Sequence, residues 1–401
     1  MRSHDVIVVG AGIVGVACAW AFACEGLEVL LLDSRPPGNH TSAAGMGHVV
    51  VMDDSEAQMR LTTRGRALLS AFLAEVPAGL AAPIEYEATG TLWIAEDEAS
   101  ALAVRAKRDA YANEGVAAEV LDRSALRAAE PCLAHDLEAG LLVPDDFVVY
   151  APTVVQALLT EARAKGVRFE AKEVVHVGPR SVLARDGQRF EADCVVVAAG
   201  ESSLGLIEVA DLENEQRAAF DALAMRRRKG QLIITERYPD FARHQLVELG
   251  YLASAHGHAR ASVAFNLQPR ATGQVLLGSS REYDAADDGV DQDVLYRMVK
   301  RAERFVPRVT DLQVLRCWSG FRVATEDHLP YVGPLWQGSS LLLACGHEGL
   351  GITTALSTAR LLRDHVLARP DTSFPIEPYL PTRHTVVLTR SSTSGDARGA
   401  D

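Results

Sequence analysis

The sequence predicts two domains threaded through each other, an α/β domain and an α+β domain with an antiparallel sheet. Alternating strand and helix patterns occur at both ends of the chain and near 151–200. Period-two alternation of apolar and polar residues dominates 229–279. The length of 401 residues suits two or three domains. Because the α/β pattern returns after the antiparallel segment, the domains are expected to be interleaved and not sequential.

The first segment, Val6–Cys24, holds 19 consecutive residues without a charge. A run of this kind resembles a membrane span or a secretory signal. Its residues divide instead into a β-branched strand at 6–9, glycines in the spacing GxGxxG at 10–15 and a helix of small residues. A second strand follows at 28–32. This is a βαβ unit of about thirty residues, and cleavage within it would destroy it, so export is disfavoured.

The glycines and the acid that ends the second strand indicate a dinucleotide site. Gly10 permits a tight turn, Gly12 lets the backbone approach a pyrophosphate, and Gly15 lets the helix pack on the strand. The helix N-terminus offers N–H groups and partial positive charge to the phosphates. Asp33, 18 positions after Gly15, would accept a hydrogen bond from the adenosine ribose. No second GxGxxG is present in the sequence, which disfavours an enzyme that also binds NAD(P)H.

Periodicity and turn residues assign the remaining elements. A turn-rich stretch of small residues is expected at 35–47, and the Ser, Thr, Gly and charge of 389–401 predict a disordered end. The expected helices are 56–76, 97–113, 152–165, 291–305 and a last one reaching about 368, and the expected strands are 90–94, 167–170, 181–184, 191–198, 231–234, 246–249, 263–267, 274–277 and 340–345.

The α/β pattern delimits the two domains. The Rossmann-like, dinucleotide-binding domain is expected at 1–45, 151–205 and 321–375, the substrate domain at 46–150 and 206–320, and a C-terminal tail at 376–401.

Charge and cysteine usage exclude other classes of function. The chain has 40 Lys+Arg against 53 Asp+Glu, a net −13, which disfavours nucleic acid as a partner. Six cysteines without a CxxC pair suggest small buried side chains in a reducing, cytoplasmic compartment. No metal-ligand pattern is evident. The one basic run, 226–229, is expected to be a solvated turn before a strand, and contact with an acidic partner or a cofactor phosphate is the alternative.

With these residues the chain resembles the D-amino acid oxidase superfamily of FAD enzymes, which includes glycine oxidase and sarcosine oxidase. Within it, the chain is most similar to the D-hydroxyproline dehydrogenases and to the β subunits of proline dehydrogenase and opine oxidase. The segments that carry the superfamily resemblance are 10–15, 41–46, 195–200, 318–322 and 346–352, and those that carry the finer one are 45–54, 244–251 and 265–270.

The resemblance implies an FAD that is bound noncovalently. Some relatives attach the flavin through a histidine, where this chain has Ser42, or through a cysteine in the last flavin loop, where 346–353 has none. The residues implied to contact FAD are Gly10, Ala11, Gly12, Ile13, Val14, Gly15, Asp33, Ser34, Arg35, Thr41, Ser42, Gly45, Met46, Gly47, His48, Val174, Ala199, Gly200, Gly346, His347, Glu348, Gly349, Leu350, Gly351, Ile352 and Thr353.

The resemblance also implies the substrate site. Arg322 matches the arginine that grips the substrate carboxylate, and a guanidinium binds a carboxylate bidentately. His48 and His347 are expected beside the flavin, either as hydrogen-bonded structural groups or in contact with the substrate. Tyr251, Phe265 and Asn266 are candidates for the pocket lining.

The expected reaction is FAD-dependent oxidation of an amino acid C–N bond to an imine by hydride transfer to flavin N5. The expected substrate is cis-4-hydroxy-D-proline, which would give a pyrroline carboxylate. The alternatives are glycine, sarcosine, another D-amino acid, proline or an opine, or a role as the FAD subunit of a multi-subunit dehydrogenase. The electron acceptor (oxygen, a quinone or a partner protein) and a homo- or hetero-oligomeric state stay open. A cytoplasmic enzyme, in contact with a membrane only through its acceptor, is expected.

Overall fold

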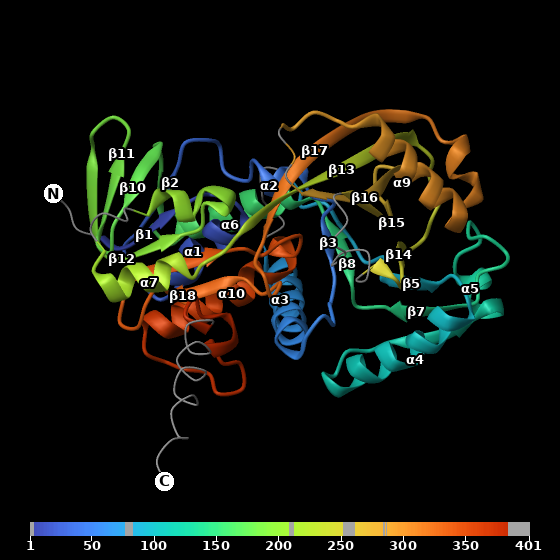
Figure 1. The fold of residues 1–401 in the computed structure, drawn as a ribbon, viewed down its shortest axis with the longest axis horizontal. Coiled ribbons are helices and arrows are strands. Elements are labelled where there is room, and N and C mark those ends of the chain that lie inside the picture. The colour runs from blue at the N-terminus through green and yellow to red at the C-terminus, as the bar shows by residue number, and fades with distance from the viewer. Residues whose placement is uncertain are drawn as a thin grey trace, which may run out of the picture.

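The computed structural model describes residues 4–76, 83–207, 212–251, 261–283, 285 and 287–383 (Figure 1). The end expected to be disordered, 389–401, lies outside them. The uncharged N-terminal run forms β1 (His4–Val9) and α1 (Ile13–Cys24), and β2 (Val29–Asp33) follows. Among the described residues, no helix combines the length and apolarity that a membrane crossing requires.

The first sheet has eight strands around a parallel centre. Strand β12 (Arg189–Val197) pairs in parallel with β1 on one side and with β19 (Leu341–Cys345) on the other. Strand β2 pairs in parallel with β1, and β9 (Arg168–Ala171) with β2. The antiparallel additions are β10 (Val174–Val177) and β11 (Ser181–Ala184) at the start of β12, and β18 (Tyr331–Pro334) beside β19.

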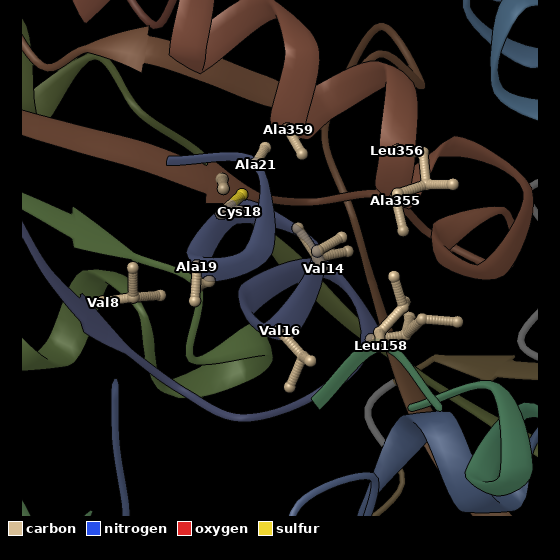
Figure 2. Packing of buried hydrophobic residues seen from close by; sticks show 14 of the residues in the cluster. Val8, Val14, Val16, Cys18, Ala19, Ala21, Leu158, Ala355, Leu356 and Ala359 are labelled. Atoms are coloured by element: carbon tan, nitrogen blue, oxygen red, sulfur yellow. The ribbon is translucent and has the colours of Figure 1, made fainter. Parts of the chain in front are cut away.

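Four helices pack together along one face of this sheet: α1, α3 (Glu56–Glu75), α6 (Ala151–Ala164) and α10 (Gly351–Val366). Helix α1 lies between α6 and α10, and Figure 2 shows Val14 near Leu158 and Leu356 in this core. Ten of the twelve residues of α1 are buried. A helix that is buried all round is apolar all round, which explains the uncharged run without a membrane.

The second sheet also has eight strands, in the order β17-β13-β16-β15-β14-β5-β7-β6. Its neighbours pair antiparallel, as the sequence predicts, except β14 and β5, which are parallel. The strands are β17 (Val314–Ala324), β13 (Arg226–Arg237), β16 (Gln274–Tyr283), β15 (Ala261–Pro269), β14 (Gln245–Glu248), β5 (Thr91–Ala95), β7 (Ala139–Val143) and β6 (Glu119–Asp122).

Helices cover this second sheet, and short elements join it to the first. Helix α9 (Gln292–Phe305) packs on one face, where Phe265 stacks on Phe305 with ring centroids 4.6 Å apart. Helix α4 (Glu98–Asn113) packs on the other, beside Trp93. The joining elements are α2 (Thr41–Ala44) and a small sheet of β3 (His48–Val49), β8 (Phe147–Val149) and β4 (Tyr86–Glu87). Of the other short helices, α5 (Arg123–Ala129) packs on β6 and β7 of the second sheet, and α7 (Asn214–Asp221) lies beside the first sheet, with Phe220 against its core.

The mixed fold class expected from the sequence is confirmed. The first sheet draws its strands from three stretches, 4–33, 168–197 and 331–345, between which the strands of the second sheet occur. The expected boundary at 321 falls inside β17. The domain division itself stays a proposal.

We expect Gly15→Ala to destabilise the protein by about 1–3 kcal/mol and to release FAD, because overpacking forces the backbone to shift. A Cβ on Gly15 would lie 1.9 Å from the Gly10 carbonyl oxygen. Urea unfolding and the flavin-to-protein absorbance ratio measure both effects. Gly205→Ala, whose Cβ would meet nothing within 4 Å, is the matched control; equal stability of the two variants would contradict the packing role.

Candidate active site

A cavity of about 960 Å³ lies where the parallel strands of the first sheet end and the second sheet begins. Gly10, Asp33, Ala199 and Gly346, at the carboxyl ends of β1, β2, β12 and β19, line one side of it. In open α/β sheets ligands bind at this edge. The volume is at the upper end of the range of roughly 300–1,000 Å³ that is usual for ligand sites, which suits a large cofactor.

The structure gathers nearly all the predicted site residues around this cavity. Of the residues expected to bind FAD, only Ala11, Gly15 and Thr353 do not line it. Those that do are Gly10, Gly12, Ile13, Val14, Asp33, Ser34, Arg35, Thr41, Ser42, Gly45, Met46, Gly47, His48, Val174, Ala199, Gly200, Gly346, His347, Glu348, Gly349, Leu350, Gly351 and Ile352, and Arg322 lines it as well.

The three exceptions support the cavity from behind. The Ala11 backbone N–H donates to Asp33 Oδ2 at 2.7 Å, and Gly15 makes the close contact of α1 with the glycine loop. Thr353 is buried in α10 and accepts a hydrogen bond from the Val50 backbone at 3.3 Å.

The glycine-loop end of the cavity has donors and charges that suit a dinucleotide. Asp33 accepts from the backbone N–H groups of Ala11 and Arg35, at 2.7 and 2.9 Å, and these contacts fix its carboxylate at the end of β2. The first turn of α1 holds no acidic residue, so the positive end of the helix dipole is not offset there. Ser42 Oγ accepts from the Ile13 backbone N–H at 3.0 Å, which ties α2 to the start of α1. These residues therefore fit the phosphate and ribose of FAD.

His48 and His347 are hydrogen-bonded to threonines and stay neutral. His48 Nε2 lies 2.7 Å from Thr91 Oγ1, and His347 Nε2 lies 2.9 Å from Thr358 Oγ1. Burial lowers the pKa of His48 to about 3 and that of His347 to about 4. Both line the cavity as uncharged groups at neutral pH.

Arg322 reaches its place because the neighbouring strand has no side chain at residue 230. Arg322 lies in β17, opposite Arg228 of β13. A Cβ on Gly230 would lie 2.0 Å from Arg322 Nη2, so the guanidinium extends across the bare backbone of β13. On the far side its Nη2 donates to the Ser280 carbonyl of β16 at 3.3 Å. Burial lowers the pKa of Arg322, and the charge of Arg281 lowers it further.

The basic run at 226–229 is part of β13, so its expected place in a solvated turn is wrong. Arg228 is only 1% exposed and forms an ion pair through Nη1 with Glu348 Oε1. The second oxygen of Glu348 lies 3.2 Å from His328 Nδ1. Burial raises the pKa of Glu348, but His328 and the charges of Arg228 and Arg281 outweigh it and bring the pKa to about 2. Arg226 and Arg227 are exposed, and Arg228 is buried because its partner lies in the loop after β19.

The alternation of side chains along β15 distinguishes between two of the three candidate pocket residues. Tyr251 and Asn266 line the cavity. Phe265 faces α9, so it is not a pocket residue. The guanidinium of Arg281 lies 4.4 Å from the centroid of the Tyr251 ring. Burial raises the pKa of Tyr251, but the charges of Arg281 and Arg322 contribute to a net lowering.

Functional residues that the sequence analysis did not assign to the site include Asp54, Arg281 and Gly230, which line the cavity, and Arg228, which holds Glu348 there. Asp54 lies in segment 45–54, and burial, with the charges of Asp53 and Glu348, raises its pKa to about 6. The sequence neighbours give no signal for either arginine: Arg228 belongs to a run of four basic residues, and Arg281 follows two serines and precedes Glu282.

Comparison with known proteins extends over both sheets. Residues 5–365 match the family model described as FAD dependent oxidoreductase. Hydrogen cyanide synthase subunit HcnC of Pseudomonas aeruginosa is 25% identical, over 95% of this chain and 96% of that protein. An opine oxidase subunit of Rhizobium meliloti is 25% identical, over 91% and 94%. Glycine oxidase of Geobacillus kaustophilus is 25% identical, over 95% and 97%. A crystal structure of glycine oxidase from Geobacillus kaustophilus superposes with a TM-score of 0.82, at 24% identity, over 96% of this chain and 100% of that one.

We expect the ring resonances of His48 and His347 to stay constant between pH 8 and pH 5 in NMR spectra. Their folded-state pKa values lie below the ordinary value of 6.5, so below that pH the unfolded chain binds protons that the folded chain does not. Stability should therefore fall, by the order of 1 kcal/mol, as the pH drops from 7 to 5. The exposed His135 is the control resonance. A midpoint near 6.5 for either buried histidine would contradict the neutral assignment.

Proposed function

We propose that this chain, which belongs to the FAD dependent oxidoreductase family, oxidises the C–N bond of an amino acid to an imine. The observation that carries the proposal is the half-buried cation Arg322, which lines the same cavity as the glycine loop. A carboxylate is the group that such a guanidinium binds best. The relatives named as glycine oxidase and as a subunit of opine oxidase support an amino acid or amine substrate.

The position of each residue around the cavity determines its role in the proposed reaction. Arg322 binds the carboxylate and so fixes which way the Cα–H bond points, which is the main requirement of the reaction. When bound, FAD supplies the acceptor for the hydride that leaves Cα. The amine must be neutral, because its lone pair forms the C=N bond, and the cationic Arg322 and Arg281 lower the pKa of a bound ammonium. Because His48 and His347 are uncharged, neither of them is an acid that would reprotonate the amine.

For the substrate we propose cis-4-hydroxy-D-proline, on the strength of segments 45–54, 244–251 and 265–270. All three supply cavity residues, among them Asp54, Tyr251 and Asn266. A second candidate is another secondary or primary amine that carries a carboxylate. The glycine oxidase and opine oxidase relatives support this candidate. In the last flavin loop, Glu348 places an acid in the site, and Gly349 leaves the next position without a side chain. Any substrate must fit both features.

The setting of the enzyme is part of the proposal. FAD is held noncovalently, with Ser42 engaged by the Ile13 backbone. Two relatives, HcnC and the one from opine oxidase, are named as subunits. Their names support a partner protein that provides the electron acceptor. We place the chain in the cytoplasm, because its apolar N-terminal run forms β1 and α1 of the fold.

Anaerobic bleaching of the flavin tests the reaction. The panel is D- and L-hydroxyprolines, prolines, glycine, sarcosine and opines, and NAD(P)H is the negative control. We expect cis-4-hydroxy-D-proline to reduce the flavin fastest. Bleaching by no member of the panel in the isolated chain, with activity restored by copurifying subunits, would favour the role of an electron-relaying subunit.

Arg322→Ala should raise KM by about two orders of magnitude or more, because the partner of a carboxylate is lost, while FAD stays bound. Steady-state kinetics with any panel substrate and the flavin absorbance measure the two effects. Arg308→Ala, an exposed arginine paired with Asp311, is the control. An unchanged KM on a carboxylated substrate would remove Arg322 from the substrate site.

Gly230→Ala should act on the same step with little effect on the fold. Its Cβ would displace the end of the Arg322 side chain and would lie 3.1 Å from the Ser280 carbonyl oxygen, so we expect KM to rise by about tenfold or more while the urea midpoint changes much less than in Gly15→Ala. Gly178→Ala, where the nearest atom to the Cβ would be Ser181 Oγ at 3.5 Å, is the matched control. A normal KM in Gly230→Ala would show that the guanidinium does not need the path across β13.

A further inference from the structure

Arg281 is a buried cation in the same cavity as Arg322. It lies in β16 and is 5% exposed. Residue 281 follows Ser280, whose carbonyl accepts from the Arg322 guanidinium, so the two arginines reach neighbouring positions from strands that flank β13. Arg281 lines the cavity together with Tyr251.

The donors of Arg281 are not satisfied by the protein. Within the part of the chain that the structure describes, its Nε and Nη1 are buried and have no hydrogen-bond partner. Its guanidinium carbon lies 4.4 Å from the centroid of the Tyr251 ring. A cation–π contact offsets part of the cost of a buried charge, but a buried guanidinium left with free N–H groups is still strongly unfavourable.

The carboxylate of Glu348, which acts electrostatically on Arg281, is paired with other groups. Glu348 acts electrostatically on Arg281 and on Arg322, but among the described residues its ion pairs are with Arg228 and His328. On the side of the cavity formed by the second sheet, the guanidinium groups of Arg281 and Arg322 therefore have no ion-pair partner in the described part of the chain. A ligand with negative charge would satisfy both.

We propose that Arg281 is a second substrate-binding residue, which donates to a carboxylate of the substrate alongside Arg322. A carboxylate has about four lone-pair sites and can accept from two guanidinium groups at once. The carboxylate is either the one that Arg322 binds or a second one on the same substrate. This inference rests on the proposed function. It narrows the substrate class to amino acids whose one carboxylate, or whose two carboxylates, are bound by the two arginines.

Ligand binding without turnover tests the proposal. Acetate, malonate and the neutral acetamide are titrated into the FAD-loaded protein at constant ionic strength, and changes in the visible flavin spectrum give the Kd of each. The variants are Arg281→Gln and Arg281→Lys, and Arg308→Gln is the matched control. The flavin spectrum and the melting temperature check that each variant is folded and loaded.

We expect Arg281→Gln to raise the Kd of carboxylates about tenfold or more, as the loss of a charge-assisted hydrogen bond implies, and to leave acetamide unchanged. Equal losses for acetate and malonate mean that both arginines bind one carboxylate. A loss confined to malonate means that Arg281 binds a second one. Arg281→Lys keeps the charge without the planar fork, so it should show a smaller loss with the same selectivity, and it serves if the Gln variant does not fold.

Two results would overturn the proposal: an unchanged Kd for both carboxylates, or a loss for acetamide as large as that for acetate, which would indicate a structural role beside Tyr251. None of the probes is oxidised, so the titration gives its answer even if no amine reduces the flavin. Failure of the proposed function and failure of this inference are therefore separate results.

Discussion

The parallel pairing of β12 with β1 on one edge and β19 on the other is the constraint on which the site depends. Val195–Val197 pairs with Ile7–Val9 and with Leu341–Leu343 in the same register. The loops that follow these strands, from parts of the sequence more than a hundred residues apart, therefore open at one edge. A slip of one residue would turn every side chain to the opposite face and move the glycine loop away from the last flavin loop.

The second sheet adds charge to that edge. Arg228, Arg281 and Arg322 come from three adjacent strands, and Glu348 neutralises only the first of them by an ion pair. Burying cations in this way is unfavourable for the empty protein and favourable for binding an anion. One side of the cavity, where the cofactor would bind, is thus formed by backbone and glycines. The other side, where the substrate would bind, carries guanidinium groups. Gly230 connects the two features, since it lets a side chain from the outermost strand reach the middle of the site.

The elements predicted well from the sequence are those fixed by local rules. The β1-α1-β2 unit follows from glycine spacing, β-branched residues and one acid within thirty positions, and α3 and α9 follow from their periodicity. The site residues that were missed depend on pairing between distant segments. Arg228 is buried by an acid 120 positions away, and no charge pattern around residue 226 reveals it. Phe265 and Asn266 are adjacent, and only the register of β15 with its neighbours decides which of them faces the cavity.

The function proposed for the chain is the removal of a hydride from the carbon that bears the amine of a carboxylated substrate. Anaerobic stopped-flow reduction of the flavin, with the best substrate of the panel and with the same compound deuterated at Cα, tests it most directly. We predict that deuterium slows the bleaching by a factor of several at saturating substrate, because the Cα–H bond breaks in that step. Equal rates for the two compounds would contradict the claim.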